Sequence, residues 1–185
     1  MDNNLITKLE SQGDWEGALA LAKESLKNEK DLTSSHYHIL GRLYQRLGKL
    51  DPAKRSYKKA LTINKNLPRT LNNLILLELD LFNTKKANKW LEIAISLDQL
   101  NDNEKELIYT SACDLKLFEL NHIKALEYIE EVLKTKTSVM ALCNKSICLQ
   151  KLGRTEEALE IQLMAAKLHI SQQNPNLLDK PIEDY

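Results

Sequence analysis

Residues 34–65, SSHYHILGRLYQRLGKLDPAKRSYKKALTINK, decide the fold of this chain. Residues spaced three or four apart predict a helix with one packing face, made by Tyr37, Leu40, Gly41 and Tyr44. Gly48 predicts the end of that helix, and Pro52 fits the first turn of a second one. The second helix is expected to pack through Ala53, Tyr57 and Ala60. Because Gly41 has no side chain, we expect the second helix to press against its backbone.

The spacing of these residues resembles the tetratricopeptide repeat (TPR), a helical hairpin of about 34 residues. Looser copies follow at intervals of 34, 38 and 33 residues, counted between the small residues Ala53, Ala87, Ala125 and Ala158. The repeats are expected at residues 3–30, 34–65, 68–98, 104–135 and 139–170. The resemblance implies an all-α, right-handed superhelical solenoid of about five stacked antiparallel helix hairpins, with residues 1–170 as a single array. Residues 171–185 contain two prolines and no helical periodicity, so a non-helical tail is predicted there.

Two of the looser repeats depart from the pattern where their helices meet or begin. Asn83 takes the place of Gly48 but lies one residue nearer to the next repeat alanine, so this turn is expected to be built differently. Asn103, with Glu106 three residues later, resembles a capping box and predicts a helix start at that point.

The composition is typical of a soluble intracellular protein. The 185 residues include 26 basic and 26 acidic ones, whereas nucleic-acid binders usually carry a basic surplus. The start, MDNNLITKLE, has no basic segment followed by an apolar run, so no signal peptide is expected. No apolar stretch approaches the ~18 residues of a membrane span. These features predict a cytoplasmic protein that binds neither nucleic acid nor membrane.

No motif for catalysis, cofactor binding or metal binding is present. The glycine-rich phosphate loop and the HExxH, GxSxG and GxGxxG patterns are all missing. His36 and His38 are two residues apart, so on a helix they point to different sides and make a poor metal pair. Cys113, Cys143 and Cys148 have no CxxC pairing and are interpreted as small core residues in a reducing compartment. We therefore expect a protein that is not an enzyme and holds no cofactor or metal.

The TPR resemblance implies that the first helix of each hairpin lines a concave groove that binds other proteins. Carried over residue by residue, the partner-binding positions are His38, Arg42, Gln45, Arg46, Arg69, Asn72, Leu76, Thr110, Cys143 and Ile147. The N-terminal part of this set is basic and its later part is apolar, which favours a peptide with acidic and apolar residues. Alternatively, the arginines are solvated charges and the leucines belong to the core.

A narrower resemblance concerns the co-chaperone TPR domains that hold a C-terminal carboxylate with lysine, arginine and asparagine side chains. Asn73 and Asn144 occupy the place of the middle asparagine in their repeats. The flanking basic residues are missing, since the places required ahead of Asn144 hold Thr110 and Asp114. A clamp for chaperone tails is therefore not expected.

The last helix of the predicted array carries two apolar stripes, and only one of them can pack on its own hairpin. The second stripe consists of Leu159, Leu163, Ala166 and Ile170. Exposed apolar surface of this kind marks contact sites. Three explanations remain open: the tail folds back through Leu177, Leu178 and Ile182, the protein self-associates through this helix, or the chain is part of a longer protein.

Two functions fit this sequence. The favoured one is a non-catalytic protein–protein interaction scaffold or adaptor, which binds a peptide or helix of a partner in its concave groove. The alternative is an N-terminal or accessory TPR module that recruits substrate for a larger enzyme or a secretion assembly.

Overall fold

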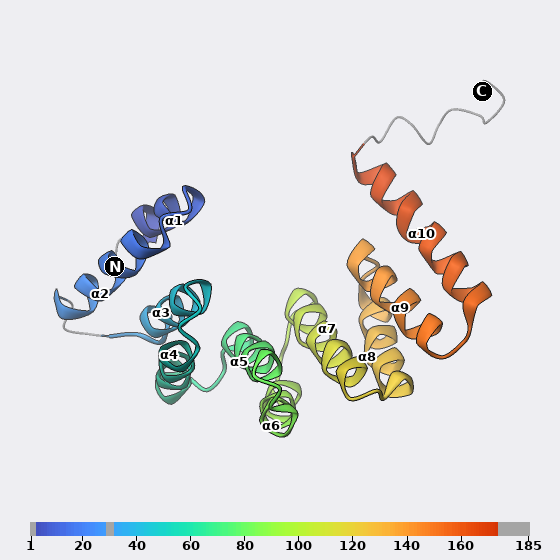
Figure 1. Ribbon diagram of the computed structural model, residues 1–185, viewed down its shortest axis with the longest axis horizontal. Helices are drawn as coiled ribbons and strands as arrows, with labels where there is room; N and C mark the ends of the chain where they lie inside the picture. Colours follow the sequence, from blue (N-terminus) through green and yellow to red (C-terminus); the bar gives the residue numbers. More distant parts are fainter. Residues whose placement is uncertain (1–2, 29–31, 174–185) are drawn as a thin grey trace. The chain divides into compact units, whose positions relative to one another are not determined.

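The computed structural model describes residues 3–28 and 32–173 (Figure 1). These residues form ten α-helices and no strand. The chain divides into two compact units, Met1–Asp98 (unit 1) and Gln99–Tyr185 (unit 2). Among the described helices, none has both the length and the apolar composition that crossing a lipid bilayer requires.

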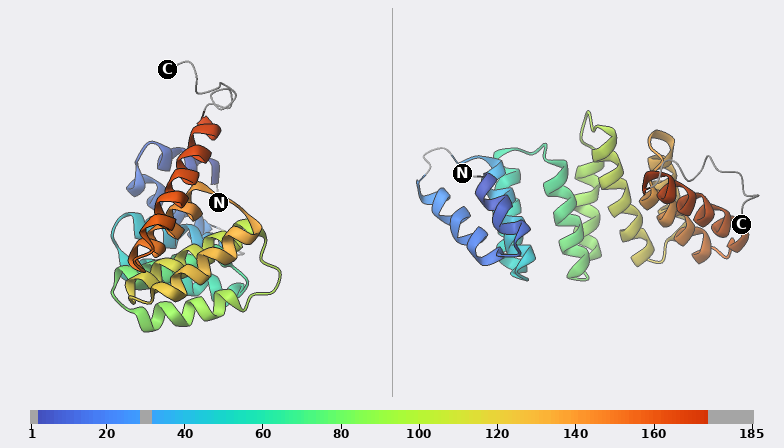
Figure 2. Two further views of the ribbon diagram at one scale, coloured as in Figure 1. Left: turned by 90° about the vertical axis from the view of Figure 1, so that its right-hand side faces the viewer. Right: turned by 90° about the horizontal axis from the view of Figure 1, so that it is seen from above.

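Both units are built from helical hairpins, in which each helix packs against the next one along the chain (Figure 2). Unit 1 contains α1 (Asn3–Ser11), α2 (Trp15–Asn28), α3 (Ser34–Arg46), α4 (Leu50–Ile63), α5 (Pro68–Asp80) and α6 (Thr84–Ile95). Unit 2 contains α7 (Asp102–Phe118), α8 (His122–Thr135), α9 (Val139–Lys151) and α10 (Thr155–Gln173). The expected number of about five hairpins is thus confirmed, whereas the single array over residues 1–170 stays a prediction.

The hairpin turns of the described chain share one backbone geometry. Each turn has one residue with positive φ, and the N–H that follows it donates to the carbonyl five residues earlier, at 2.8–3.0 Å. This is the hydrogen bond of the Schellman motif, which favours glycine at the positive-φ position. The expectation that the turn at Asn83 is built differently was therefore wrong: Phe82 takes the positive φ (56°) there, five residues before Ala87 as Gly48 is before Ala53, and Leu120 (59°) does so between α7 and α8. The other three turns use glycine: Gly13, Gly48 and Gly153.

The predicted start of a helix at Asn103 was wrong. Helix α7 begins at Asp102, and the capping box is made by Asn101 and Glu104, whose side chains each accept the other's backbone N–H. Glu106 is instead buried. It accepts a hydrogen bond from Ser138 (2.6 Å), which, with the nearby Lys136, holds the pKa of its carboxyl below the ordinary value.

The end of the predicted array also needs correction. Helix α10 continues to Gln173, so residues 171–173 are helical and do not belong to a non-helical tail. Ala158 and Ala165 are buried on one face of this helix, but Leu159 and Leu163 are 58% and 56% exposed. The second apolar stripe is therefore open to solvent within the described chain. The proposed tail anchors Leu177, Leu178 and Ile182 lie outside the described residues.

Tyr57 is the largest fully buried side chain of unit 1. Its ring lies against the backbone of Gly41, where a Cβ atom would overlap the ring carbons. The expected close approach of the two helices at Gly41 is thus confirmed. Around this contact, Tyr57 packs with Ala53, Leu74 and Leu77.

The core of unit 2 contains two of the three cysteines. Cys113 and Cys148 are fully buried, and their Sγ atoms lie 3.6 Å apart as free thiols. Cys143 is exposed, so its interpretation as a core residue was wrong. Ile129 and Leu149 complete this apolar cluster.

Candidate partner-binding site

A recess in unit 1 brings together polar side chains of α3 and α5. Its volume is about 360 Å³, and its lining consists of Arg42, Gln45, Arg46 and Asn73. The first three lie on one face of α3, at spacings of three and four residues, and Asn73 comes from the neighbouring helix α5. All four side chains carry N–H donors, and none of them is acidic.

Both arginines of the recess are held by residues of the first hairpin. Arg42 Nη2 lies 2.9 and 3.0 Å from the two carboxylate oxygens of Glu10 on α1. The guanidinium carbon of Arg46 lies 5.5 Å from the centre of the Trp15 ring on α2, within cation–π range. The side chain of Glu10 is 9% exposed, so a largely buried carboxylate fixes Arg42.

The two amides of the recess are joined through Tyr57. The phenol O–H of Tyr57 donates to Gln45 Oε1 (2.8 Å), and the amide of Asn73 donates to the phenol oxygen (3.2 Å). Burial raises the pKa of Tyr57 to about 12, so the phenol keeps its proton at neutral pH. The amide oxygen of Gln45 accepts the hydrogen bond from this phenol, which leaves the Gln45 NH₂ group as a donor for a ligand.

His38 and Arg69 lie near Arg42 of the recess. His38 Nδ1 is hydrogen-bonded to Thr70 Oγ1 at 2.8 Å. Burial lowers the pKa of His38, and the charges of Arg42 and Arg69 lower it further. Because its pKa is lowered, His38 is mainly neutral at neutral pH, and the positive charge beside it comes from Arg42 and Arg69.

The remaining positions expected to contact a partner have different environments. Asn72 is buried (3% exposed), and Leu76 is half-buried on α5. In unit 2, Thr110 is half-buried on α7, whereas Cys143 and Ile147 are exposed on α9. Asn73 was missing from the expected set. Its match to the middle asparagine of the clamp was the one sequence signal that pointed to it.

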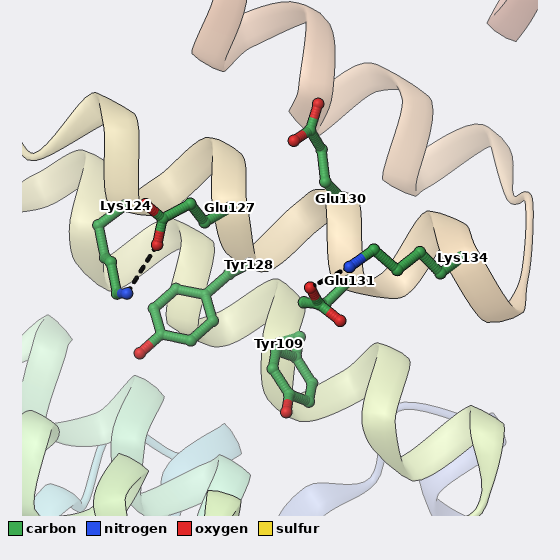
Figure 3. Close-up of a pocket in the computed structure, with 7 residues that line it drawn as sticks. All are labelled: Tyr109, Lys124, Glu127, Tyr128, Glu130, Glu131 and Lys134. Carbon is green, nitrogen blue, oxygen red and sulfur yellow. Dashed lines mark hydrogen bonds and ion pairs between the residues drawn. The ribbon is translucent and has the colours of Figure 1, made fainter.

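A second recess, of about 340 Å³, lies on unit 2 (Figure 3). Its lining residues, from α7 and α8, are Tyr109, Lys124, Glu127, Tyr128, Glu130, Glu131 and Lys134. Lys124 pairs with Glu127 (2.6 Å) and Lys134 pairs with Glu131, as the dashed lines in Figure 3 mark, while Glu130 pairs with Lys145 (3.0 Å). Each charged side chain of this recess is therefore paired with an opposite charge.

Neither recess has the composition of a catalytic or metal site. The unit 1 recess offers donors and positive charge, and its lining contains no nucleophile beside a general base. Within residues 3–28 and 32–173, no group of three His, Cys, Asp or Glu side chains could hold a metal ion. The donors and the positive charge of the unit 1 recess are the chemistry that favours an anion.

Comparisons with known proteins agree with this architecture. The family model of the tetratricopeptide repeat matches residues 9–66, which run from the last turn of α1 to just past the end of α4. A search of curated proteins finds no match to the chain.

Several solved structures resemble the fold. BtubC from P. vanneervenii is 20% identical with a TM-score of 0.79, over 92% of this chain and 79% of that one. PilF from Pseudomonas aeruginosa is 17% identical with a TM-score of 0.75, over 95% and 91% of the two chains. A Podospora anserina protein with nearly identical TPR-like repeats is 15% identical with a TM-score of 0.73, over 92% and 93%. At these identities the likeness shows the fold alone.

The expected fold class, an all-α solenoid of stacked hairpins, is therefore confirmed. The family model thus marks residues 9–66 as tetratricopeptide repeat, and the similar folds extend the same hairpin architecture over more than nine-tenths of the chain.

Proposed function

We propose that this chain is a non-catalytic interaction module, a scaffold or adaptor that binds a carboxylate-bearing peptide segment of another protein in the recess of unit 1. TPR proteins generally mediate protein–protein interactions, which is the coarser role that the family supports. The proposal adds the ligand chemistry. It rests on the lining of the recess, in which two guanidinium groups and two amides converge.

The observation that carries the proposal is that every lining side chain is held by a neighbour. Glu10 and Trp15 fix the two arginines, and Tyr57 fixes both amides. Ligand binding therefore has to order few side chains, and this ordering commonly costs about 0.5–1.5 kcal/mol for each one. Preorganised donors of this kind are the usual form of an anion site.

The donors of the recess match a carboxylate better than a neutral ligand. A guanidinium group has five N–H donors in a planar fork, and Glu10 occupies only Nη2 of Arg42. The recess is larger than one carboxylate, so a neighbouring side chain of the ligand enters with it. Leu76, one helical turn beyond Asn73, offers apolar surface for that side chain.

Unit 2 offers an apolar contact of its own. Met140 and Ile147 on α9 are 51% and 41% exposed, and Cys143 lies exposed between them. At spacings of three and four residues they form one stripe along the helix. We propose that this stripe contacts apolar side chains of a partner protein.

The carboxylate site is tested with three fluorescein-labelled peptides and the whole chain. The peptide LAELD with a free C-terminus carries three carboxylates, LAELD-amide carries two, and LAQLN-amide carries none. We expect LAELD to bind and LAQLN-amide to show no binding. If LAELD-amide binds as tightly as LAELD, the site recognises acidic side chains. If LAELD-amide binds at least about tenfold more weakly, the site recognises a terminal carboxylate.

The location of the site is tested by charge reversal. Arg42→Glu combined with Arg46→Glu is expected to weaken LAELD binding at least about tenfold, a loss of ~1.4 kcal/mol. The matched control combines Lys8→Glu and Lys27→Glu, exposed residues of α1 and α2 that do not line the recess. Equal losses in both double variants would show that only net charge matters and would overturn the proposal.

A further inference from the structure

A recess on another side of unit 1 lies between α4 and α6. It has a volume of about 300 Å³, and α5 packs against both flanking helices. Lys58 of α4 and Lys86 and Lys89 of α6 surround it, while Trp90 and Ile93 supply apolar surface. Glu78 of α5 completes the lining. Glu78 is five residues from Asn73, so at about 100° per residue it projects roughly 140° away from the carboxylate site.

The three lysines of this recess are not neutralised. They are exposed, and no carboxylate within residues 3–28 and 32–173 pairs with Lys58, Lys86 or Lys89. The two helices α4 and α6 together carry seven basic residues and only two acidic ones. The Tyr109 recess of unit 2 also combines lysines with aromatic rings, but there each lysine has its own glutamate. The α4/α6 recess is thus a positively charged surface that attracts an acidic partner.

Glu78 gives this recess a hydrogen-bond acceptor at its base. The residue is fully buried, and Lys54 Nζ forms an ion pair with its Oε1 atom. Its Oε2 atom has no hydrogen-bond partner among the described residues. A buried acceptor without a donor is unfavourable, so a ligand that brings an O–H or N–H group to Oε2 would be stabilised.

The apolar part of the recess suits a ring. Trp90 packs against the buried cluster of Ala53, Tyr57, Leu74 and Leu77, so its position is fixed by the core of unit 1. Ile93, one turn later on the same helix, is 43% exposed. A side chain that enters here contacts apolar surface and has lysine ammonium groups around it.

We propose that the α4/α6 recess binds an acidic protein segment that inserts a tyrosine side chain. The tyrosine ring packs on Trp90 and Ile93, and its phenol O–H donates to Glu78 Oε2. Carboxylates on either side of the tyrosine pair with Lys58, Lys86 and Lys89. This site goes beyond the carboxylate site of α3 and α5, because it uses different residues and recognises a tyrosine side chain as well as negative charge.

A protein segment fits this recess better than a nucleic acid does. The Glu78 carboxylate at the base would repel a phosphate group. A single-stranded oligonucleotide would use the lysines alone, and its binding would fall steeply with salt.

The test uses the whole chain and the capped peptide EEEYEEE with fluorescein at its amino end. We expect saturable binding by fluorescence anisotropy at concentrations below about 1 mM. EEEFEEE, which lacks the phenol O–H, is expected to bind at least about threefold more weakly, and EEEAEEE at least about tenfold more weakly. If EEEAEEE binds as tightly as EEEYEEE, or if EEEYEEE shows no saturable binding, the proposal is overturned.

Variants of exposed lysines locate the peptide. Lys86→Glu combined with Lys89→Glu is expected to weaken EEEYEEE binding at least about tenfold, with an unchanged circular dichroism spectrum. The control combines Lys65→Glu and Lys85→Glu, which are exposed and lie outside the recess. It is expected to retain binding within about threefold. Equal losses in the two double variants would mean general charge attraction and would overturn the proposal.

Two further comparisons separate this site from other binding modes. The double variant Arg42→Glu and Arg46→Glu is expected to bind EEEYEEE as tightly as the unmodified chain does. If the carboxylate site of α3 and α5 turned out not to bind LAELD, the expected binding of EEEYEEE would therefore be unaffected. An oligo-dT strand is expected not to displace the peptide. Tighter binding of oligo-dT than of EEEYEEE, abolished by Lys86→Glu and Lys89→Glu, would assign the recess to nucleic acid.

Discussion

Unit 1 and unit 2 place different side chains at the same position of the repeat. Tyr57 follows the repeat residue Ala53 by four places, and Ile129 follows Ala125 by four places, and both side chains are fully buried. The Tyr57 hydroxyl reaches Gln45 and Asn73 and fixes two donors of the recess. Ile129 has no polar atom, so it can only pack. One buried hydroxyl thus links the core of unit 1 to its surface.

The surface charge of the two units differs as well. Residues 1–98 include 16 basic and 12 acidic side chains, whereas residues 99–185 include 10 basic and 14 acidic ones. The net charge of zero therefore hides a basic unit 1 and an acidic unit 2. The affinity of unit 1 for acidic ligands depends on its own positive charge and not on the net charge of the whole chain, because association follows the local potential.

The largest expected effect concerns the ion pair of Lys54 with the buried Glu78. Lys54→Met leaves a carboxylate without its partner in the core of unit 1, which commonly costs about 3–5 kcal/mol. Adding Glu78→Leu is expected to restore most of that stability. Tryptophan fluorescence during urea unfolding measures this, because Trp15 and Trp90 both lie in unit 1.

The matched variant in unit 2 is Lys116→Met. Lys116 occupies the place of Glu78 in its repeat and pairs with Glu119 at 2.8 Å. Because the Glu119 side chain is 25% exposed, water can replace the lysine, and a loss of less than about 1 kcal/mol is expected by circular dichroism. Similar losses for Lys54→Met and Lys116→Met would contradict the assignment of a costly buried charge to unit 1 alone.

The next effect comes from the contact between α3 and α4. Gly41→Ala would place a methyl group on the buried ring of Tyr57, and overpacking of this kind costs about 1–3 kcal/mol. The better helix propensity of alanine returns about 1 kcal/mol, so a net loss of up to ~2 kcal/mol is expected in urea unfolding. Ser146→Ala, at the corresponding place in unit 2, removes atoms and is expected to change stability less. A stabilising Gly41→Ala would show that Tyr57 can move aside.

The sequence predicts the hairpins better than it predicts the turns and helix ends. Gly48 and Gly153 predict a turn residue with positive φ. Phe82 and Leu120 adopt positive φ without being glycine, because the helices on both sides are fixed by packing. The pair Asn103 and Glu106 has the same spacing as the true capping box two residues earlier. A local capping pattern alone therefore does not determine where α7 begins. Glu106 is not available for a capping box, because it is buried and accepts a hydrogen bond from Ser138, the N-cap residue of α9.

The candidate site is likewise predicted well from the sequence of one helix and poorly from that of another. Arg42, Gln45 and Arg46 lie on α3, whose register is marked by the full repeat pattern, and they do share one recess. On α5 the repeat is loose, and the expected Asn72 is buried while its neighbour Asn73 lines the recess. A shift of one residue turns a side chain by about 100° on a helix. Where the residues that define the repeat are absent, the sequence therefore does not determine which side chains of the helix face the recess.

A smaller effect is expected from the hydroxyl that distinguishes Tyr57 from Ile129. Tyr57→Phe removes one hydrogen-bonding group, which costs about 1 kcal/mol, and it frees Gln45 and Asn73 to rotate. LAELD binding is expected to weaken about fivefold. The control, Ile129→Val, costs a similar ~0.5–1.5 kcal/mol but should leave that affinity unchanged. If both variants weaken binding equally, stability and not the hydroxyl determines the affinity.

The smallest effect is a pH dependence of the stability of unit 1 through His38. Burial and the nearby Arg42 and Arg69 lower the pKa of His38 in the folded chain, whereas in the unfolded chain the pKa returns to about 6.5. The unfolded chain therefore binds more protons. The stability that His38 contributes is fully present above about pH 6.5 and is lost as the pH falls through the lower folded pKa.

This dependence is measured as a difference between variants. Between about pH 7.5 and pH 5, the unmodified chain is expected to lose more stability than His38→Gln, as followed by tryptophan fluorescence in urea. His169→Gln, in α10 of unit 2, should leave that fluorescence transition unchanged. A saturating concentration of LAELD should reduce the difference, because a bound carboxylate offsets the positive charge of Arg42 and Arg69 and stabilises the protonated imidazole. A difference that LAELD leaves unchanged would place the bound carboxylate away from His38 and narrow the site to Arg46 and Asn73.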